Sequence, residues 1–318
     1  MTIGVILHVD NPALDDAVQI ALAAEDAGAT WIGLPDAFWW RDTWMMALEV
    51  ARATRRIAVG PLVTNPFMRH RFHTISALAT LHEASDGRAM LGLGAGGSEI
   101  TDAAGISRGG AGPAIADLVR GMRAAASGAP LHEPSKRHLS VPFTSAPRVI
   151  VAGRGRGVLR AAGAVADAAL LWALPARELS AAVGTVRDAA RARDAEPAVI
   201  WAPLVDHTGD AREQTAYAVV NSSQESHRAW GLDADAVAEL RSIAVAEGNR
   251  VASRLVPGSI AKEIVVPGDD PNRAAQLAAG IGANEIAVRA DSADGVGARV
   301  DWARRALLAA AADVTSAR

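Results

Sequence analysis

The chain of 318 residues contains no cysteine, which excludes disulfide bonds, thiolate nucleophiles and cysteine-built zinc sites. The chain also lacks a large net charge of either sign, since 32 basic and 35 acidic residues leave a formal net charge of -3. With no basic block, nucleic acid is not expected as a partner. No apolar run reaches the ~18 residues of a membrane helix, and the opening residues do not resemble a signal peptide. We therefore expect a cytoplasmic protein that does not bind membranes.

Several catalytic signatures are missing as well. The chain carries no Walker loop, nucleophile elbow or kinase signature. His70 and His73 lie three residues apart, but no third ligand accompanies them, so no metal site is predicted. Aromatic residues are few: eight Trp, four Phe and one Tyr.

The stretch from Arg56 to Gly97 gives the clearest structural signal. Apolar runs at Ile57–Val59 and Met90–Leu93 flank Thr74–Ala84, where apolar residues recur at helical spacing. This order of strand, helix and strand predicts a right-handed parallel crossover. Both strands end in glycine-rich or proline-rich loops at the carboxyl edge of the sheet, where ligands of such sheets bind.

The same alternation continues along the chain and predicts eight strand–helix units. The expected strands are Ile3–Val9, Trp31–Leu34, Arg56–Val63, Arg88–Leu93, Arg148–Ala152, Ala168–Trp172, Ala198–Val205 and Glu285–Val288. Eight units favour a (β/α)8 barrel, that is, a TIM barrel. An open doubly wound sheet is the alternative. We expect one barrel domain over 1–318, with insertions after strands 4 and 7 and a helical insert near 210–254. The pattern leaves open whether Ile260–Val266 is a short strand or a loop.

Two loops are expected to hold a flat, phosphate-bearing cofactor: GPLVTNP at 60–66 and GLGAGG at 92–97. Gly92, Gly94 and Gly97 loosely match the dinucleotide fingerprint. That fingerprint needs a helix directly afterwards, and none is predicted before Pro113. We therefore interpret the glycines as allowing close approach of a ligand ring to the backbone.

A third loop, Gly153–Gly157, reads GRGRG between a strand and a helix. Glycine amides at a helix N-terminus and two arginines favour an anion, so this loop is the predicted phosphate cradle. The alternative is an ordinary loop with solvated arginines.

Aromatic side chains gather in the loop after the second strand. Phe38, Trp39 and Trp40 are adjacent there, and Trp172 ends the sixth strand. Such a cluster favours a binding wall, although packing onto the barrel rim is the alternative. The candidates for proton transfer near strand ends are His8, Asp10, Asp36, Glu99, Asp206 and His207.

Two strings resemble the luciferase-like superfamily: VTNPFMRHRFHTISALATLHEASDGRAMLGLGAG at 63–96 and APRVIVAGRGRGVLRAAGAVADAAL at 146–170. They are most similar to its deazaflavin-dependent branch of the methylenetetrahydromethanopterin reductase type. The resemblance implies a TIM barrel that binds coenzyme F420, or FMN as the alternative, at the carboxyl ends of its strands. It also implies a non-proline cis peptide bond at Leu62–Val63, beside the ring.

The resemblance assigns roles to individual positions. Thr64, Asn65, Gly94, Ala95 and Gly96 match positions near the ring, together with Leu62 and Val63. The phosphate positions are Ala152, Gly153, Arg154, Gly155 and Arg156. Our candidate catalytic residues are Asp36 and His8, for proton transfer, and Trp40, which with Trp39 would form the substrate wall. The candidate substrate-binding residues are Phe38, Trp39, Glu99 and Trp172.

The chain also departs from the family pattern, since Ala37 stands where several members carry a histidine. The expected function is an F420-dependent oxidoreductase that moves a hydride to or from an electron-poor C=C or C=N bond of a small molecule. The alternatives are an FMN-dependent monooxygenase fed by a separate reductase and a non-enzymatic flavin-binding barrel. A sugar-phosphate isomerase barrel is disfavoured, because the GRGRG loop follows strand five. A homodimer is expected, as in other barrels of this family.

Overall fold

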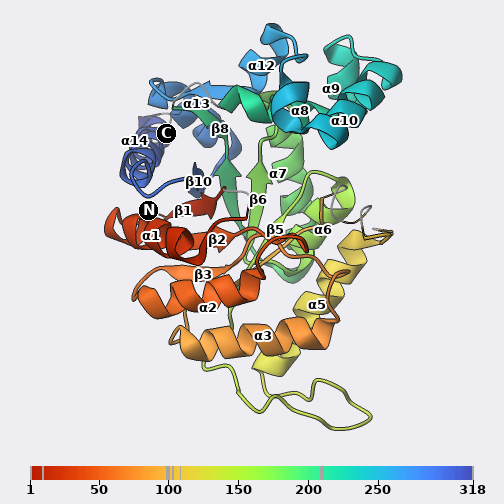
Figure 1. The fold of residues 1–318 in the computed structure, drawn as a ribbon, viewed down its shortest axis with the longest axis vertical. Helices are drawn as coiled ribbons and strands as arrows, with labels where there is room; N and C mark the ends of the chain where they lie inside the picture. The colour runs from red at the N-terminus through yellow and green to blue at the C-terminus, as the bar shows by residue number, and fades with distance from the viewer. Residues whose placement is uncertain are drawn as a thin grey trace.

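A closed barrel of parallel strands organises the computed structural model, which describes residues 2–8, 11–97, 101, 104–107, 109–207 and 211–316 (Figure 1). The sheet has the order β3-β2-β1-β10-β7-β6-β5-β4. Isolated bridges Val59–Ala89 and Thr64–Leu93 join β3 to β4. The eight strands are β1 (Thr2–Leu7), β2 (Trp31–Leu34), β3 (Ala58–Pro61), β4 (Met90–Leu93), β5 (Arg148–Ala152), β6 (Ala168–Trp172), β7 (Ala198–Ala202) and β10 (Glu285–Ala290). The predicted TIM barrel is confirmed, and the open sheet is excluded.

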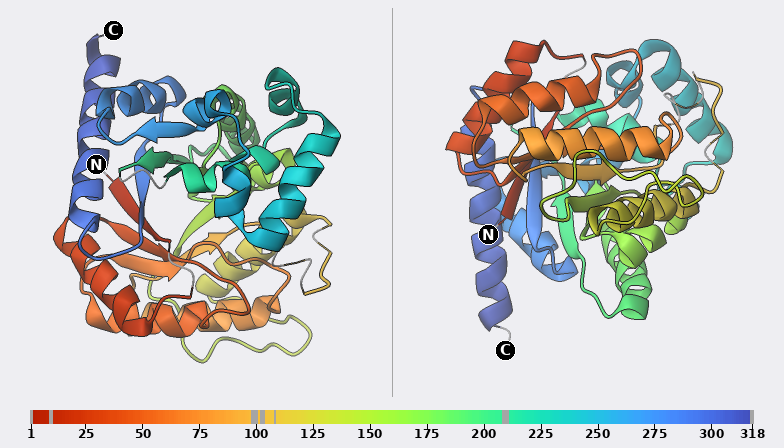
Figure 2. Two further views of the ribbon diagram at one scale, coloured as in Figure 1. Left: turned by 45° about the horizontal axis from the view of Figure 1, so that its top comes forward. Right: turned by 90° about the horizontal axis from the view of Figure 1, so that it is seen from below.

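Helices surround the barrel on its outside. They are α1 (Leu14–Asp26), α2 (Thr43–Ala53), α3 (Arg71–Ala84), α5 (Ala111–Ala126), α6 (Arg156–Val165), α7 (Ala176–Ala190), α13 (Pro271–Ile281) and α14 (Val296–Ser316). Local chemistry fixes several ends: the Asp42 carboxylate accepts the amides of Trp44 and Met45 and begins α2. The long α14 packs against α1 and α13 and stands beside the N-terminus (Figure 2).

The chain after β7 differs from its predicted course. A single strand was expected through Val205, but Pro203 has no amide to donate, and a separate strand β8 (Leu204–Asp206) follows it. Beyond it lie η2 (Ala211–Gln214), α8 (Thr215–Val220), α9 (Gln224–Ala229), α10 (Ala234–Glu247), α11 (Asn249–Ser253), α12 (Gly258–Ile264) and β9 (Val265–Pro267). The segment left open near Ile260 is thus the end of a helix followed by β9, which pairs with β8. These helices lie together at one end of the molecule (Figure 1).

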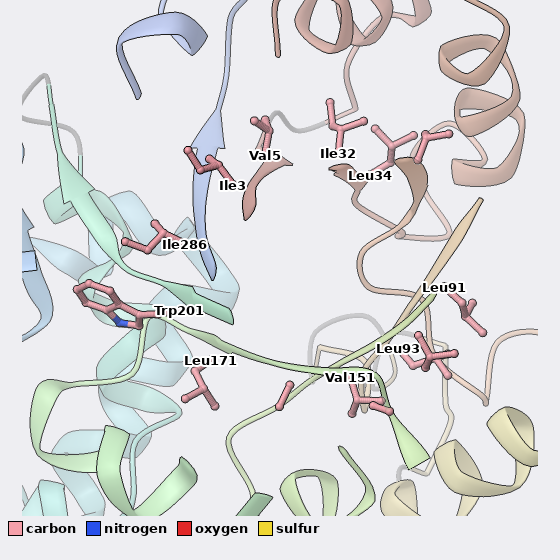
Figure 3. Packing of buried hydrophobic residues seen from close by; sticks show 14 of the residues in the cluster. Ile3, Val5, Ile32, Leu34, Leu91, Leu93, Val151, Leu171, Trp201 and Ile286 are labelled. Carbon is pink, nitrogen blue, oxygen red and sulfur yellow. The ribbon is translucent and has the colours of Figure 1, made fainter. Parts of the chain in front are cut away.

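Apolar residues form separate clusters outside and inside the barrel. Alternate residues of each strand point outward against the helices, as Ile3, Val5, Leu91, Val151 and Ile286 do (Figure 3). The intervening residues fill the interior, among them Trp31, Met90, Ile150, Leu170, Ile200 and Ala287. A third cluster lies among β8 and α8–α12. Four tryptophans also belong to the core, since Trp31, Trp44, Trp201 and Trp302 are each at most 7% exposed.

Polar groups close the amino-terminal end of the barrel. The Trp31 indole donates to the Glu285 carboxylate at 3.1 Å, and Arg148 forms an ion pair with the same carboxylate. Glu285 is 5% exposed. The indole lies over Gly4, where a Cβ would be only 1.9 Å from the ring. With this end filled, a ligand can enter the barrel only from the carboxyl ends of the strands.

Candidate active site

The segment after β3 turns back into the barrel mouth. Its Leu62–Val63 peptide bond is cis, at the position that the resemblance singles out. Leu62 is buried in the interior between Gly33 and Gly92, where a Cβ on either glycine would lie 2.4 Å from a Leu62 atom. A Cβ on Gly94 would similarly lie 2.8 Å from the Val63 side chain. Gly92 and Gly94 therefore make room for the side chains of Leu62 and Val63. The sequence analysis explained these glycines instead by the close approach of a ligand ring to the backbone.

The loops after β3 and β4 are joined by backbone hydrogen bonds. The Thr64 amide donates to Gly92 at 3.0 Å, and the Gly94 amide donates to Thr64 at 2.9 Å. The Asn65 side-chain oxygen accepts the amides of Phe67 and Met68, which shapes the next turn. The predicted ring-facing residues of these two loops are thus brought together, and Thr64 and Asn65 are buried.

Asp36 lies half-buried just beyond β2. Burial raises the pKa of its carboxyl, and the nearby negative charge of Asp42 raises it further. The Thr64 side chain and Arg69 act in the opposite direction without cancelling the rise. A carboxyl of this kind retains its proton to higher pH than a solvated one, as a proton donor requires.

The aromatic loop at 38–40 lies at the surface. Phe38 and Trp39 are 53% and 48% exposed, and their rings meet edge to face at 4.8 Å. Trp40 is half-buried, and its ring centroid lies 6.4 Å from that of Trp39. Arg41 anchors the loop by donating to the Asn11 carbonyl at 3.0 Å. Phe38 and Trp39 are therefore exposed to solvent, whereas Trp40 is partly covered.

A second aromatic group lies at the ends of β1 and β6. The His8 and Trp172 ring centroids are 6.1 Å apart, and Tyr217 of α8 lies 4.8 Å from Trp172. The structure thus unites two predicted site residues with one that the sequence analysis missed. Tyr217 is the only tyrosine of the chain, but nothing in its local pattern places α8 beside β6.

The GRGRG loop places its two arginines differently. Gly155 precedes the first turn of α6 with extended backbone, and Gly155, Arg156 and Gly157 are exposed. Arg154 instead points into the protein and donates to the carbonyls of Trp172, Ala173 and Ala218. A Cβ on Gly153 would lie 2.4 Å from Val158, so this glycine is needed for packing of α6. Arg156 is therefore the arginine of this loop that reaches solvent at the helix N-terminus.

Of the remaining candidates, two fall outside the described residues and two lie at the end of β8. Glu99 and Asp10 fall outside the described residues. Asp206 ends β8, and the His207 ring packs edge-on against Trp302 at 5.7 Å. No helix among the described residues has the length and apolar character needed to cross a bilayer.

Comparison with known proteins decides the family. The model of the luciferase-like monooxygenase family matches residues 1–285. The chain belongs to this family. A methylenetetrahydromethanopterin reductase from Methanolobus tindarius is 37% identical over 107 residues, which are 34% of this chain and 32% of that relative. The match thus spans about a third of either protein.

Solved structures of this family share the fold at low identity. The coenzyme F420-dependent tetrahydromethanopterin reductase from Methanopyrus kandleri superposes with a TM-score of 0.79 at 19% identity, covering 95% of this chain and 98% of that one. Monooxygenase RslO1 from Streptomyces bottropensis has a TM-score of 0.64 at 18% identity, covering 97% and 99%. At these identities the similarity concerns the fold of this luciferase-like chain.

Proposed function

We propose that this protein is an F420-dependent oxidoreductase, which moves a hydride between the deazaflavin and an electron-poor C=C or C=N bond of a small molecule. Family membership and the similarity to methylenetetrahydromethanopterin reductase support this proposal. The observation that carries it is the half-buried Asp36 carboxyl beside the joined loops after β3 and β4. A proton source next to a ring-binding surface is what reduction of such a bond requires, because the hydride acceptor must also take up a proton.

The residues present fit the proposed cofactor. The segments Leu62–Asn65 and Gly94–Gly96 are joined by backbone hydrogen bonds at the carboxyl ends of β3 and β4, where a flat ring would lie against them. The exposed amides of Gly155–Gly157 begin α6 and suit a phosphate together with Arg156. When bound, the deazaflavin would supply or accept the hydride.

The protein's own contribution is orientation and proton transfer. Asp36 would hold a proton at its carboxyl and donate it to the substrate atom next to the one that receives hydride. His8 is the second candidate for this transfer. Phe38, Trp39, Trp40 and Trp172 would bind the substrate and exclude water from the reacting atoms. We also propose a small-molecule substrate and a homodimer.

An FMN-dependent monooxygenase is the second candidate, since a monooxygenase is among the structures that share the fold. Titration of the purified protein with coenzyme F420, and separately with FMN, distinguishes the two candidates through cofactor fluorescence. Micromolar or tighter binding of F420 with weak FMN binding is expected. The reverse preference would favour the monooxygenase, and binding of neither would contradict both.

The proton-donor role has its own test. With reduced F420 and an accepted substrate, the rate of the wild-type protein should fall as pH rises through the pKa of Asp36, because the donor loses its proton. Asp36→Asn should lower this rate by about 10²-fold or more while F420 affinity stays unchanged. An unaltered pH profile in Asp36→Asn would transfer the role to another group.

A further inference from the structure

Arg154 connects three segments that are distant in the sequence. It starts in the GRGRG loop after β5. Its Nη1 donates to the Ala218 carbonyl of α8 at 3.1 Å. Its Nη2 donates to the carbonyls of Trp172 at 3.0 Å and Ala173 at 2.5 Å, at the end of β6. The loop, the end of β6 and α8 are therefore held together by one side chain.

The environment of this guanidinium is confined. Burial lowers the pKa of Arg154, while Tyr217 and Glu178 counteract that effect. The guanidinium carbon lies 5.5 Å from the centroid of the Tyr217 ring, within the range of a cation–π contact. A buried cation held by carbonyls on two segments fixes the distance between those segments, because shifting either one would leave donors unpaired.

Two of the segments that Arg154 joins carry Trp172 and Tyr217, which form the aromatic wall together with His8 at the end of β1. Trp172 packs on both the barrel interior and the apolar cluster of α8–α12. Its indole nitrogen is buried and has no hydrogen-bond acceptor among the residues that the structure describes. The wall therefore presents the half-buried Trp172 ring at the barrel mouth, and its geometry depends on how α8 sits against β6.

The backbone of Arg154 is continuous with the loop that would hold a phosphate. Gly155 and Gly157 follow within three residues, and a Cβ on either would meet no atom within 4 Å. Gly157 packs closely against α5, since a Cβ on Gly112 would lie 2.5 Å from its carbonyl oxygen, whereas Gly155 is exposed and precedes α6 with extended backbone. A ligand held at Gly155 would restrain the backbone next to Arg154. Fixing the loop would fix Arg154, and through its three hydrogen bonds the positions of Trp172 and Tyr217.

We infer that Arg154 is a positioning residue that couples the phosphate loop to the aromatic wall, so that cofactor binding orders the substrate side of the site. The inference rests on the proposed function. Coupling is reciprocal, so substrate at the wall would also tighten cofactor binding. Arg156, in the same loop, would contact the phosphate directly and does not share this role.

Hydrogen exchange of the full-length protein, with and without saturating F420, tests the coupling. In the wild type, F420 should slow exchange in the loops at 62–65 and 94–97, and in α8 by at least about fivefold. In Arg154→Gln the loops should stay protected while the F420-induced slowing in α8 is lost. In Arg154→Lys the F420-induced slowing of exchange in α8 should lie between those of the wild type and Arg154→Gln, because one ammonium replaces two separate donor nitrogens. Arg160→Gln, at an exposed position of α6, should behave as the wild type.

The outcomes separate this inference from the proposed function. If F420 slows exchange in the loops of the wild type but not in α8, the inferred coupling is wrong, while F420 binding still holds. If Arg154→Gln speeds exchange in α8 equally with and without F420, its role is only structural, and the inference fails. Should Arg154→Gln not fold, equal F420-induced slowing in the wild type and Arg154→Lys would overturn it. If F420 protects no segment, the proposed function fails first.

Discussion

At the scale of single residues, the proposed proton donor Asp36 lies where its charged form is unfavourable. Burial and Asp42 disfavour its charged form. Because its pKa is higher in the folded than in the unfolded state, the stability that its proton confers is complete below the unfolded value of about 3.9 and is lost as pH rises through the folded value. At neutral pH the fold is therefore less stable than it would be with an uncharged side chain of the same shape at this position.

Asp36→Asn should consequently unfold at higher urea concentration than the wild type at pH 7. The difference should shrink as pH falls towards the unfolded value of about 3.9, because the wild-type carboxyl then gains its proton in both states. Urea titrations between pH 4 and pH 8 measure this. Asp26→Asn, at an exposed position of α1, is the matched control and should change little. A stability difference that does not vary with pH would contradict the assignment.

Gly94 is a second residue whose role can be tested alone. A Cβ there would press on Val63, so Gly94→Ala should lower the free energy of unfolding by about 1–3 kcal/mol. In a Val63→Ala background the loss should be smaller, because Val63 Cγ2 is the nearest contact. Chemical denaturation of the four proteins of this cycle gives the coupling. Strict additivity would show that contact with Val63 does not cause the loss.

Gly184→Ala provides the contrasting control for that experiment. This glycine lies within α7, and a Cβ would meet no atom within 4 Å. Alanine there should stabilise the protein by about 0.5–1 kcal/mol through helix propensity.

At the scale of elements, one carboxylate fixes how β3 begins. Glu25, near the end of α1 and 7% exposed, accepts the amides of Arg55, Arg56 and Ile57. Burial alone would raise the pKa of Glu25, but these hydrogen bonds outweigh it and lower the pKa. The strand β3, which leads to Leu62, is thus held by a helix as well as by its neighbouring strands.

Glu25→Gln should destabilise the protein by about 1–3 kcal/mol at pH 7, because an amide oxygen accepts these bonds more weakly than a carboxylate. Since the folded pKa is lowered, this contribution is present above the unfolded value of about 4.3 and is lost as pH falls through the folded one. The gap should therefore narrow below about pH 4. Glu49→Gln, exposed on α2, is the control, and equal losses in both variants would refute this role.

At the scale of the whole molecule, closure of the barrel depends on pairs that span the chain. Glu285 of β10 holds Trp31 of β2 and Arg148 of β5 across the interior. Glu285→Gln should lower the free energy of unfolding by about 1–3 kcal/mol, less than for a fully buried pair because Arg148 is 30% exposed. A single cooperative transition with a lower midpoint is expected. A change confined to one region in hydrogen exchange would contradict this account.

The sequence predicted the barrel because short apolar runs alternate with segments of helical spacing along the chain. The bounds of Trp31–Leu34, Arg148–Ala152 and Ala168–Trp172 were predicted as the structure has them. The three-residue pair of β8 and β9 was not foreseen, since so short a pattern carries no periodicity.

The sequence pattern does not predict where a long side chain points. Arg154 turns towards Ala218, 64 residues further along the chain, and only the packing of α8 sets that course. For the same reason, the need for Gly92 became visible only when Leu62 was placed inside the barrel.

The separate apolar cluster of α8–α12 has a consequence for how such a protein can diversify. Its members pack mainly on one another and meet the barrel interior at Trp172. A lineage could therefore exchange or remodel this helical segment while inheriting the loops after β3 and β4 unchanged. Selection for a new substrate would then act first on Trp172, Tyr217 and Arg154, the points at which old and new parts of the chain must agree.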